Sequence, residues 1–292
     1  MALHPQGHSP LMLLFFVRLL ACLPLSWLQA GGRLIGLLIY CFPGRYRRRL
    51  QANARRAGFD SPAFFRRAAA ESGAMILETP KIWWRTSQCL TLTHSDQESV
   101  VQDALADGRG VLYLTPHLGC FEIAGRHLTR HGPLTAMFRP SRSPVLDAVI
   151  ATARGMPNLH TVPTNRHGVR EFVRALKRGE AVGMLPDQVP REGDGLWLPF
   201  FGDYALTVTL PARLALQTGV AVILSAGERL PRGRGWRIHY LRLPDPLPQT
   251  PEALTLAINQ AMETLIRRFP EQYLWSYNRY KQPDDAPPPP ED

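Results

Sequence analysis

The stretch that decides the fold is VLYLTPHLGCFEIAGR, residues 111–126. Its opening apolar run, Val111–Leu114, predicts a short buried strand that ends before Pro116. After Gly119 the apolar residues recur every three or four positions, as they do on one face of a helix. The sequence therefore predicts a strand, a turn and a helix in direct succession, with His117 in the turn.

His117 and Glu122 lie on either side of this predicted turn. In a continuous helix, their spacing would set them about 140° apart around the axis, so a bend at Gly119 is needed to bring the carboxylate to the ring. A carboxylate on one imidazole nitrogen fixes the tautomer and leaves the other nitrogen free as a base. The spacing alone fits equally well a junction histidine bonded to a neighbouring residue. Cys120 is interpreted as a packing residue.

Beyond this stretch, predicted helices and strands alternate along the chain. We expect strands over 134–138, 181–185, 220–225 and 236–241, and helices over 97–106, 144–154, 169–177, 210–217 and 252–269, after a helical segment from 43 to 84. This alternation is typical of an α/β domain in which one mostly parallel sheet is flanked by helices. We assign that domain to residues 43–282. The proline-rich, acidic residues 283–292 are expected to be disordered.

Residues 1–42 are predicted to form an N-terminal hydrophobic membrane anchor. The run Leu11–Leu28 is almost entirely apolar and about long enough to span a bilayer or to lie in its interface, and a second apolar patch covers Leu34–Phe42. No Lys or Arg precedes the run, whereas arginines follow it at 45 and 47–49. The positive-inside rule then places the rest of the chain in the cytoplasm. A cleaved signal peptide is the competing interpretation, but the segment lacks a basic beginning.

The chain carries a formal charge of +10, and most of its cations are arginines. Arginine binds phosphates, carboxylates and anionic surfaces through its fork of donors. Nucleic acid, anionic lipid and an acidic protein all remain possible partners on this ground. The four cysteines show no paired, metal-like spacing, which predicts a reducing compartment without disulfides or structural zinc.

Several familiar catalytic motifs are absent from the sequence. It contains no phosphate-binding Gly-x4-Gly-Lys-Ser/Thr loop, no dinucleotide Gly-x-Gly-x-x-Gly turn, no His-Glu-x-x-His and no Gly-x-Ser-x-Gly, and this argues against the corresponding chemistries. A histidine base without a protein nucleophile suits removal of the proton from a substrate hydroxyl, which then attacks an acyl group directly. Backbone N–H groups near Gly119 are expected to stabilise the oxyanion.

Further candidate residues follow the predicted strands, where open α/β sheets place ligand groups. Arg139 follows the strand 134–138, and Arg154 closes the next helix. Asp187 and Gln188 follow the strand 181–185, and the apolar stretch 198–202 is expected to be a loop that lines an acyl channel or touches the membrane. Each has a structural alternative: a surface charge for the arginines, a turn or cap for Asp187, and a core plug for the phenylalanines.

Together, these motifs resemble a known family in their order along the chain. They are HLGCFE (117–122), FRP (138–140), SPVLD (143–147), PDQ (186–188), PFFG (199–202) and PEQYLWSYNRYK (270–281). The set resembles the late acyltransferases of lipid A biosynthesis, the lauroyl and myristoyl transferases of Gram-negative bacteria. These belong to the wider His-x4-Asp/Glu group of lysophospholipid and glycerolphosphate acyltransferases. The resemblance extends from the N-terminal segment to Lys281.

The resemblance implies a glycerolphosphate-acyltransferase-like fold and transfer of a fatty acyl chain from acyl carrier protein to a hydroxyl of a lipid A precursor. His117 would be the general base and Glu122 its orienting carboxylate. Arg139 and Arg154 would bind a phosphate or sugar acid, or the developing oxyanion, and Asp187 and Gln188 would support substrate binding.

The enzyme would use no metal and no cofactor besides the acyl donor. It would act at the inner membrane with its catalytic domain facing the cytoplasm, and its acidic partners would be the carrier protein and the phosphorylated glycolipid, not nucleic acid.

The sequence departs from the family pattern at a few positions. Leu118, Gly119 and Cys120 stand where the family often has polar residues, and Ser143 stands where Asn is usual. These differences leave the donor and the acceptor position open. The alternatives are a lysophospholipid or aminolipid acceptor, water as the acceptor in a thioesterase, and a non-catalytic basic protein that binds anionic lipid.

Overall fold

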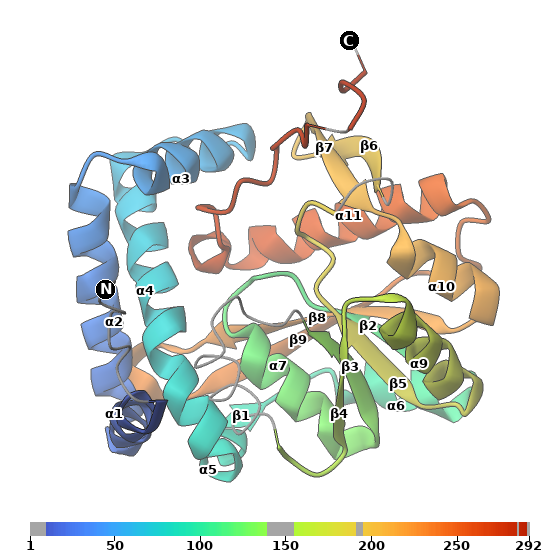
Figure 1. Ribbon diagram of the computed structural model, residues 1–292, viewed down its shortest axis with the longest axis horizontal. Coiled ribbons are helices and arrows are strands. Elements are labelled where there is room, and N and C mark those ends of the chain that lie inside the picture. Colours follow the sequence, from blue (N-terminus) through green and yellow to red (C-terminus); the bar gives the residue numbers. More distant parts are fainter. Residues whose placement is uncertain (1–9, 139–154, 191–194, 285, 291–292) are drawn as a thin grey trace, which may run out of the picture.

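The computed structural model of the 292-residue chain describes residues 10–138, 155–190, 195–284 and 286–290. Its centre is a seven-stranded sheet in the order β1-β9-β8-β2-β5-β3-β4, with helices on both faces (Figure 1). The strands are β1 (Thr93–His94), β2 (Val111–Leu114), β3 (Leu134–Phe138), β4 (Leu159–Pro163), β5 (Ala181–Met184), β8 (Ala221–Arg229) and β9 (Trp236–Arg242). The predicted α/β class is confirmed.

Strand β2 lies in the middle of the sheet and pairs in parallel with β5 on one side and β8 on the other. Its four residues are all buried. Leu112 and Leu114 join the hydrophobic core on one face, whereas Val111 and Tyr113 join the core on the opposite face. A strand covered on both faces needs apolar side chains at every position, which explains the continuous apolar run.

The sheet is parallel except at one edge, where β9 runs antiparallel to β8 and pairs in parallel with the short β1. The five strands that the sequence predicts, over 111–114, 134–138, 181–185, 220–225 and 236–241, are all present. Strands β1 and β4 were not predicted. Half of the residues in β1 and two of those in β4 are exposed, so neither strand has the buried apolar run by which the other strands are recognised.

Helices cover the sheet in two groups. One core packs against α3 (Arg45–Arg56), α4 (Pro62–Trp84), α9 (Arg166–Lys177), α10 (Leu210–Thr218) and α11 (Pro251–Arg268). The other core includes α5 (Thr86–Thr91), α6 (Glu98–Ala106) and α7 (Phe121–Leu128), which continues into the short helix η1 (Thr129–His131). Two further short helices are η2 (Pro231–Gly233) and η3 (Pro270–Gln272). The predicted helix over 144–154 lies outside the described residues.

The stretch 198–202 is not the apolar loop that the sequence suggested. It belongs to a β-hairpin of β6 (Gly195–Phe200) and β7 (Asp203–Val208), whose turn is Phe201-Gly202. Both turn residues have positive φ. Phe200 and Phe201 are buried in the core beside Trp275. The phenylalanine pair therefore fills the core, as the structural alternative expected.

The N-terminal apolar run forms two helices instead of the single anchor helix expected over Leu11–Leu28. Helix α1 (Pro10–Cys22) and helix α2 (Leu25–Cys41) meet at an angle of 118°. The break falls before Pro24, because proline disfavours helical backbone in the residue that precedes it. Within the described part of the chain, no single helix is long and apolar enough to cross a membrane, although this bent pair passes the same test of length and composition.

Helix α2 packs along α4 through glycines, and Figure 1 shows the two helices side by side. A Cβ atom at Gly73 would collide with the backbone of Gly32 and Gly36, and a Cβ at Gly36 would collide with the backbone of Ala69. Small residues allow two helix backbones to approach this closely. The close approach of α2 to α4 therefore depends on these glycines.

We predict that Gly73→Ala destabilises the protein, whereas Gly125→Ala does not. Both glycines lie inside helices, where alanine is intrinsically better by about 1 kcal/mol. The added methyl group has open space at Gly125 but meets backbone at Gly73, and overpacking of this kind costs about 1–3 kcal/mol. Thermal unfolding of the purified variants in detergent measures the difference. Equal melting temperatures for the two variants would show that the α2–α4 contact is not tight.

Candidate active site

The sheet register brings His117 and Asp187 together at the carboxyl end of adjacent strands. Leu114 of β2 lies opposite Met184 of β5, and each of the two functional residues follows three positions later. The backbone N–H of Thr115 donates to the carbonyl of Met184 at 3.1 Å and continues the ladder beyond the strands. Ligand groups gather at this edge in open parallel sheets.

The Asp187 carboxylate binds His117 through both of its oxygens. Oδ1 lies 2.8 Å from Nδ1 of the ring, and Oδ2 accepts the backbone N–H of His117 at 2.8 Å. The side chain of Asp187 is 3% exposed and that of His117 is 14% exposed. Burial alone would raise the pKa of Asp187, but the charge of His117 and the two hydrogen bonds outweigh it and lower this pKa. The anionic carboxylate accepts from Nδ1–H, which leaves the lone pair on Nε2.

Gln188 contacts the other side of the same ring. Its Nε2 lies 3.2 Å from Nε2 of His117, and in the Nδ1–H tautomer the amide of Gln188 donates to the ring nitrogen. Asp187 and Gln188 thus hold the two nitrogens of one imidazole. The structure brings together three of the predicted site residues, although Asp187 was expected to bind substrate and instead contacts His117.

Glu122 lies in the first turn of α7 and is partly exposed. One of its oxygens is 3.9 Å from the guanidinium of Arg126, one helical turn further on. Among the described residues, no hydrogen bond or ion pair joins Glu122 to His117. The carboxylate expected on the ring is therefore replaced by Asp187, while a catalytic role for Glu122 stays a prediction.

The N–H groups near Gly119 already donate to protein carbonyls. Gly119 adopts a positive φ of 60°; its N–H donates to the carbonyl of Gln272 at 2.9 Å, and that of Cys120 donates to Gly227 at 2.7 Å. The N–H groups of Gly119 and Cys120 are therefore committed to the fold, and an oxyanion role for other backbone groups of this turn stays a prediction. Burial raises the pKa of the Cys120 thiol well above its usual value, which keeps it protonated and unsuited to nucleophilic attack.

The segment that begins with η3 packs against the turn that contains His117. The N–H of Leu274 donates to the carbonyl of His117 at 3.0 Å, and residues Leu118 and Tyr273 form an antiparallel bridge. The side chain of Asn53 in α3 donates to the carbonyl of Trp275 at 2.7 Å. The last sequence motif, 270–281, therefore positions the histidine turn.

A buried ion-pair network supports the turn from the side of α4. Arg229, at the end of β8, binds Glu78 through two nitrogens at 2.7 and 2.9 Å and Glu71 through a third at 2.7 Å. Arg229 and Glu78 are fully buried. The side chain of Gln272 binds the backbone of Arg229 through both its amide oxygen and its nitrogen. This network joins α4, β8 and the segment behind His117.

Arg139 and Arg154 lie outside the described residues. A cavity of about 150 Å³ opens at the far edge of the sheet, near the beginnings of β2 and β8. Its polar lining includes Arg109, Arg242 and Asp245. The cavity lies at the opposite ends of these strands from His117, so it is separate from the candidate active site.

The fold and the site define a protein with a histidine–carboxylate pair placed where open α/β sheets bind ligands. Over residues 2–282, the sequence matches the family described as bacterial lipid A biosynthesis acyltransferase. Since the match spans almost the whole chain, the protein belongs to this family, and the predicted enzyme class of acyltransferase is confirmed. This membership argues against the non-catalytic interpretation.

Curated relatives carry names that agree with the family. The chain is 27% identical over 220 residues to the lipid A biosynthesis lauroyltransferase of Escherichia coli K12, which covers 74% of this chain and 71% of that protein. It is 27% identical over 211 residues to the palmitoleoyltransferase of the same organism, covering 72% and 68%. A Haemophilus influenzae lipid A biosynthesis acyltransferase is 25% identical over 206 residues, covering 70% and 62%.

We predict that Glu78→Ala destabilises the protein by about 3–5 kcal/mol, because removing one partner of a buried pair leaves the other charge uncompensated. The matched control is Glu171→Ala, which breaks the Glu171–Arg174 pair on the surface of α9 and should cost less than about 1 kcal/mol. Urea unfolding in detergent gives both free energies. A Glu78 variant as stable as the control would contradict the proposed support of the turn.

Proposed function

We propose that the enzyme transfers a fatty acyl chain from acyl carrier protein to a hydroxyl group of a lipid A precursor, with His117 as the general base. The observation that carries this proposal is the Asp187–His117 pair, which leaves the lone pair of Nε2 for proton transfer. Membership of the lipid A acyltransferase family supports the acceptor class. The names of the Escherichia coli relatives support a fatty acyl group as the cargo.

The proposed reaction needs one proton transfer in each direction. The acceptor hydroxyl displaces the Gln188 amide at Nε2, gives its proton to His117 and attacks the thioester carbonyl of the donor. The tetrahedral intermediate then collapses, and the thiolate of the carrier leaves and takes the proton back from the imidazolium. Asp187 stabilises that imidazolium by its negative charge and by the hydrogen bond at Nδ1. No acyl-enzyme is formed, in agreement with the buried, protonated thiol of Cys120.

Three predicted residues complete the proposed site. Arg139 and Arg154 would bind the phosphates of the acceptor or the developing oxyanion, a role that suits the planar guanidinium. Glu122, five residues after His117, would contribute a second negative charge near the ring when the imidazolium forms. The positively charged chain also suits two acidic partners, the carrier protein and the phosphorylated glycolipid.

We further propose that α1 and α2 bind the inner membrane from its cytoplasmic side. Large apolar side chains are exposed along both helices, namely Phe15, Phe16, Leu19, Trp27, Leu34, Ile35, Leu38, Ile39 and Phe42. Apolar surface of this extent is rare on proteins that meet only water. Arginines 45 and 47–49 follow directly in α3, where they can contact anionic headgroups.

We predict that His117→Ala abolishes acyl transfer and that Asp187→Asn lowers kcat by up to about 10⁴-fold, because the neutral amide no longer fixes the tautomer or stabilises the imidazolium. Glu122→Ala is also expected to abolish transfer. The control is Asp60→Asn, which removes an exposed charge paired with Arg55 and should leave kcat unchanged. Rates with purified acyl carrier protein donors measure these effects, and thermal unfolding verifies that each variant is folded. Full activity of the folded His117→Ala enzyme would falsify the mechanism.

The acceptor is tested by mass spectrometry. We expect that lipid A from cells that lack the protein has one acyl chain fewer than lipid A from cells that contain it, and that the purified enzyme restores this chain from an acyl carrier protein thioester. An unchanged lipid A pattern, with acylation of a lysophospholipid or an aminolipid instead, would move the enzyme to another acceptor. Release of free fatty acid without transfer would identify a thioesterase.

A further inference from the structure

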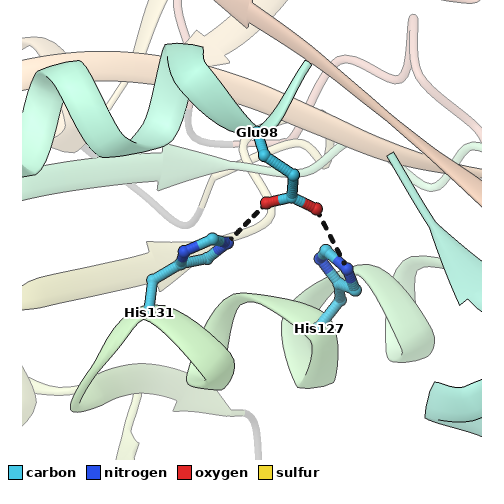
Figure 2. A group of neighbouring side chains, drawn as sticks. All are labelled: Glu98, His127 and His131. Carbon is cyan, nitrogen blue, oxygen red and sulfur yellow. Dashed lines mark ion pairs between the residues drawn. The ribbon is translucent and has the colours of Figure 1, made fainter. Parts of the chain in front are cut away.

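Three potential metal ligands meet on the face of the sheet covered by α6 and α7. They are Glu98, the first residue of α6, His127 in α7 and His131 in η1. Figure 2 shows both imidazole rings directed at the carboxylate of Glu98. Nε2 of His127 lies 3.3 Å from Oε1 and Nε2 of His131 lies 2.8 Å from Oε2. The three ligand atoms all lie within 4.8 Å of one another.

The local fold explains why these residues converge. His127 and His131 are four positions apart, and residues with this spacing lie on the same side of a helix. Helix α6 packs beside β9 and on the same core as α7, so the start of α6 brings Glu98 across from the two histidines. The pair of rings lies on one continuous turn, T-shaped at a centroid distance of 6.1 Å.

The contacts have the distances of ion pairs but not the geometry of hydrogen bonds. Nε2 of His127, Nε2 of His131 and Oε2 of Glu98 are buried and find no hydrogen-bond partner in the part of the chain that the structure describes. Three unsatisfied donor or acceptor atoms around one point are costly in a protein interior. The three atoms lie close enough together for one cation to satisfy all of them.

The surroundings of His127 suit a metal ligand. Its side chain is 1% exposed, and Nδ1 lies 3.0 Å from the hydroxyl of Tyr240. Such a bond to the second ring nitrogen orients most metal-binding histidines and fixes their tautomer.

The cluster lies close to the surface, because the side chains of His131 and Glu98 are 16% and 33% exposed, respectively. Two imidazoles and one carboxylate form a ligand set that suits Zn²⁺, with water as the fourth ligand. Mg²⁺ and Ca²⁺ prefer sites made almost entirely of oxygen.

We propose that Glu98, His127 and His131 bind one Zn²⁺ ion, which clamps α6 to the end of α7. The ion joins two segments that are separated in sequence by the whole of β2 and the histidine turn. Since α7 begins four residues after His117, the clamp stabilises the helix that follows the candidate active site. The role is structural and independent of the acyl transfer step.

The test uses the full chain in detergent after removal of metal with a chelator. We expect one equivalent of Zn²⁺ to bind in competition with a chromophoric chelator. We also expect the melting temperature to rise by about 5–10 °C when free Zn²⁺ exceeds the dissociation constant a hundredfold. The variant His131→Gln should bind Zn²⁺ at least about 100-fold more weakly. The matched control His160→Gln removes an exposed histidine of β4 and should bind like the wild type.

Two further measurements keep the proposal open to refutation if His131→Gln does not fold. Glu98→Gln keeps the size of the side chain, and we expect it to weaken Zn²⁺ binding in the same way. Co²⁺ bound to the wild-type protein should show the visible absorption of a tetrahedral site. The proposal is overturned if the wild type binds no stoichiometric Zn²⁺, or if both His131→Gln and Glu98→Gln bind it as the wild type does. It is also overturned if His131→Gln lowers the melting temperature equally with and without Zn²⁺, as a metal-free polar cluster would.

Discussion

The two hydrogen bonds that the Asp187 carboxylate accepts from His117 hold the candidate site together. One bond fixes the imidazole and the other fixes the backbone of the turn, so a single side chain defines both the position and the tautomer of the base. An ionised carboxylate that is almost fully buried needs compensation. His117 supplies most of it, and the buried guanidinium of Arg279 also lowers the pKa of Asp187.

The surrounding structure keeps that geometry through hydrogen bonds to the backbone of the turn. The N–H of Gly119, the N–H of Cys120 and the carbonyl of His117 all pair with segments that are distant in sequence. The turn is thus hydrogen-bonded both to β8 and to the segment after α11. Gly119 is required there because its φ is positive and a Cβ would collide with the carbonyl of Gly227. The turn therefore has little freedom to rearrange, which suits a base that must meet its substrate in one orientation.

Local patterns predicted the elements, whereas contacts between distant residues could not be predicted from them. The apolar run of β2 and the helical spacing after Gly119 identified the strand–turn–helix unit, because both are set by near neighbours in the chain. The partner of His117 is 70 positions away in sequence. Finding it requires knowing that β2 and β5 are adjacent and in which register, so the nearer Glu122 was chosen instead.

The same limit explains the other differences. The proposed zinc cluster includes Glu98, which approaches the two histidines only after α6 and α7 have packed on the same face of the sheet. The expectation of no structural zinc rests on the cysteine spacing alone, whereas the zinc signal in this sequence is the pair of histidines four positions apart. The break in the N-terminal run, in contrast, has a local signal in Pro24. Hydropathy alone measures how long the apolar run is and does not include the effect of this proline on the helix.

Gln188 gives the resting site a further property. A neutral imidazole nitrogen in a largely buried position needs a hydrogen-bond donor, and the amide of Gln188 supplies one at 3.2 Å. When an acceptor hydroxyl takes its place, one neutral hydrogen bond replaces another. The free energies of such bonds differ by only about 1 kcal/mol. In the proposed mechanism, the base therefore has a hydrogen-bond donor before the substrate arrives and gives up this donor at little cost.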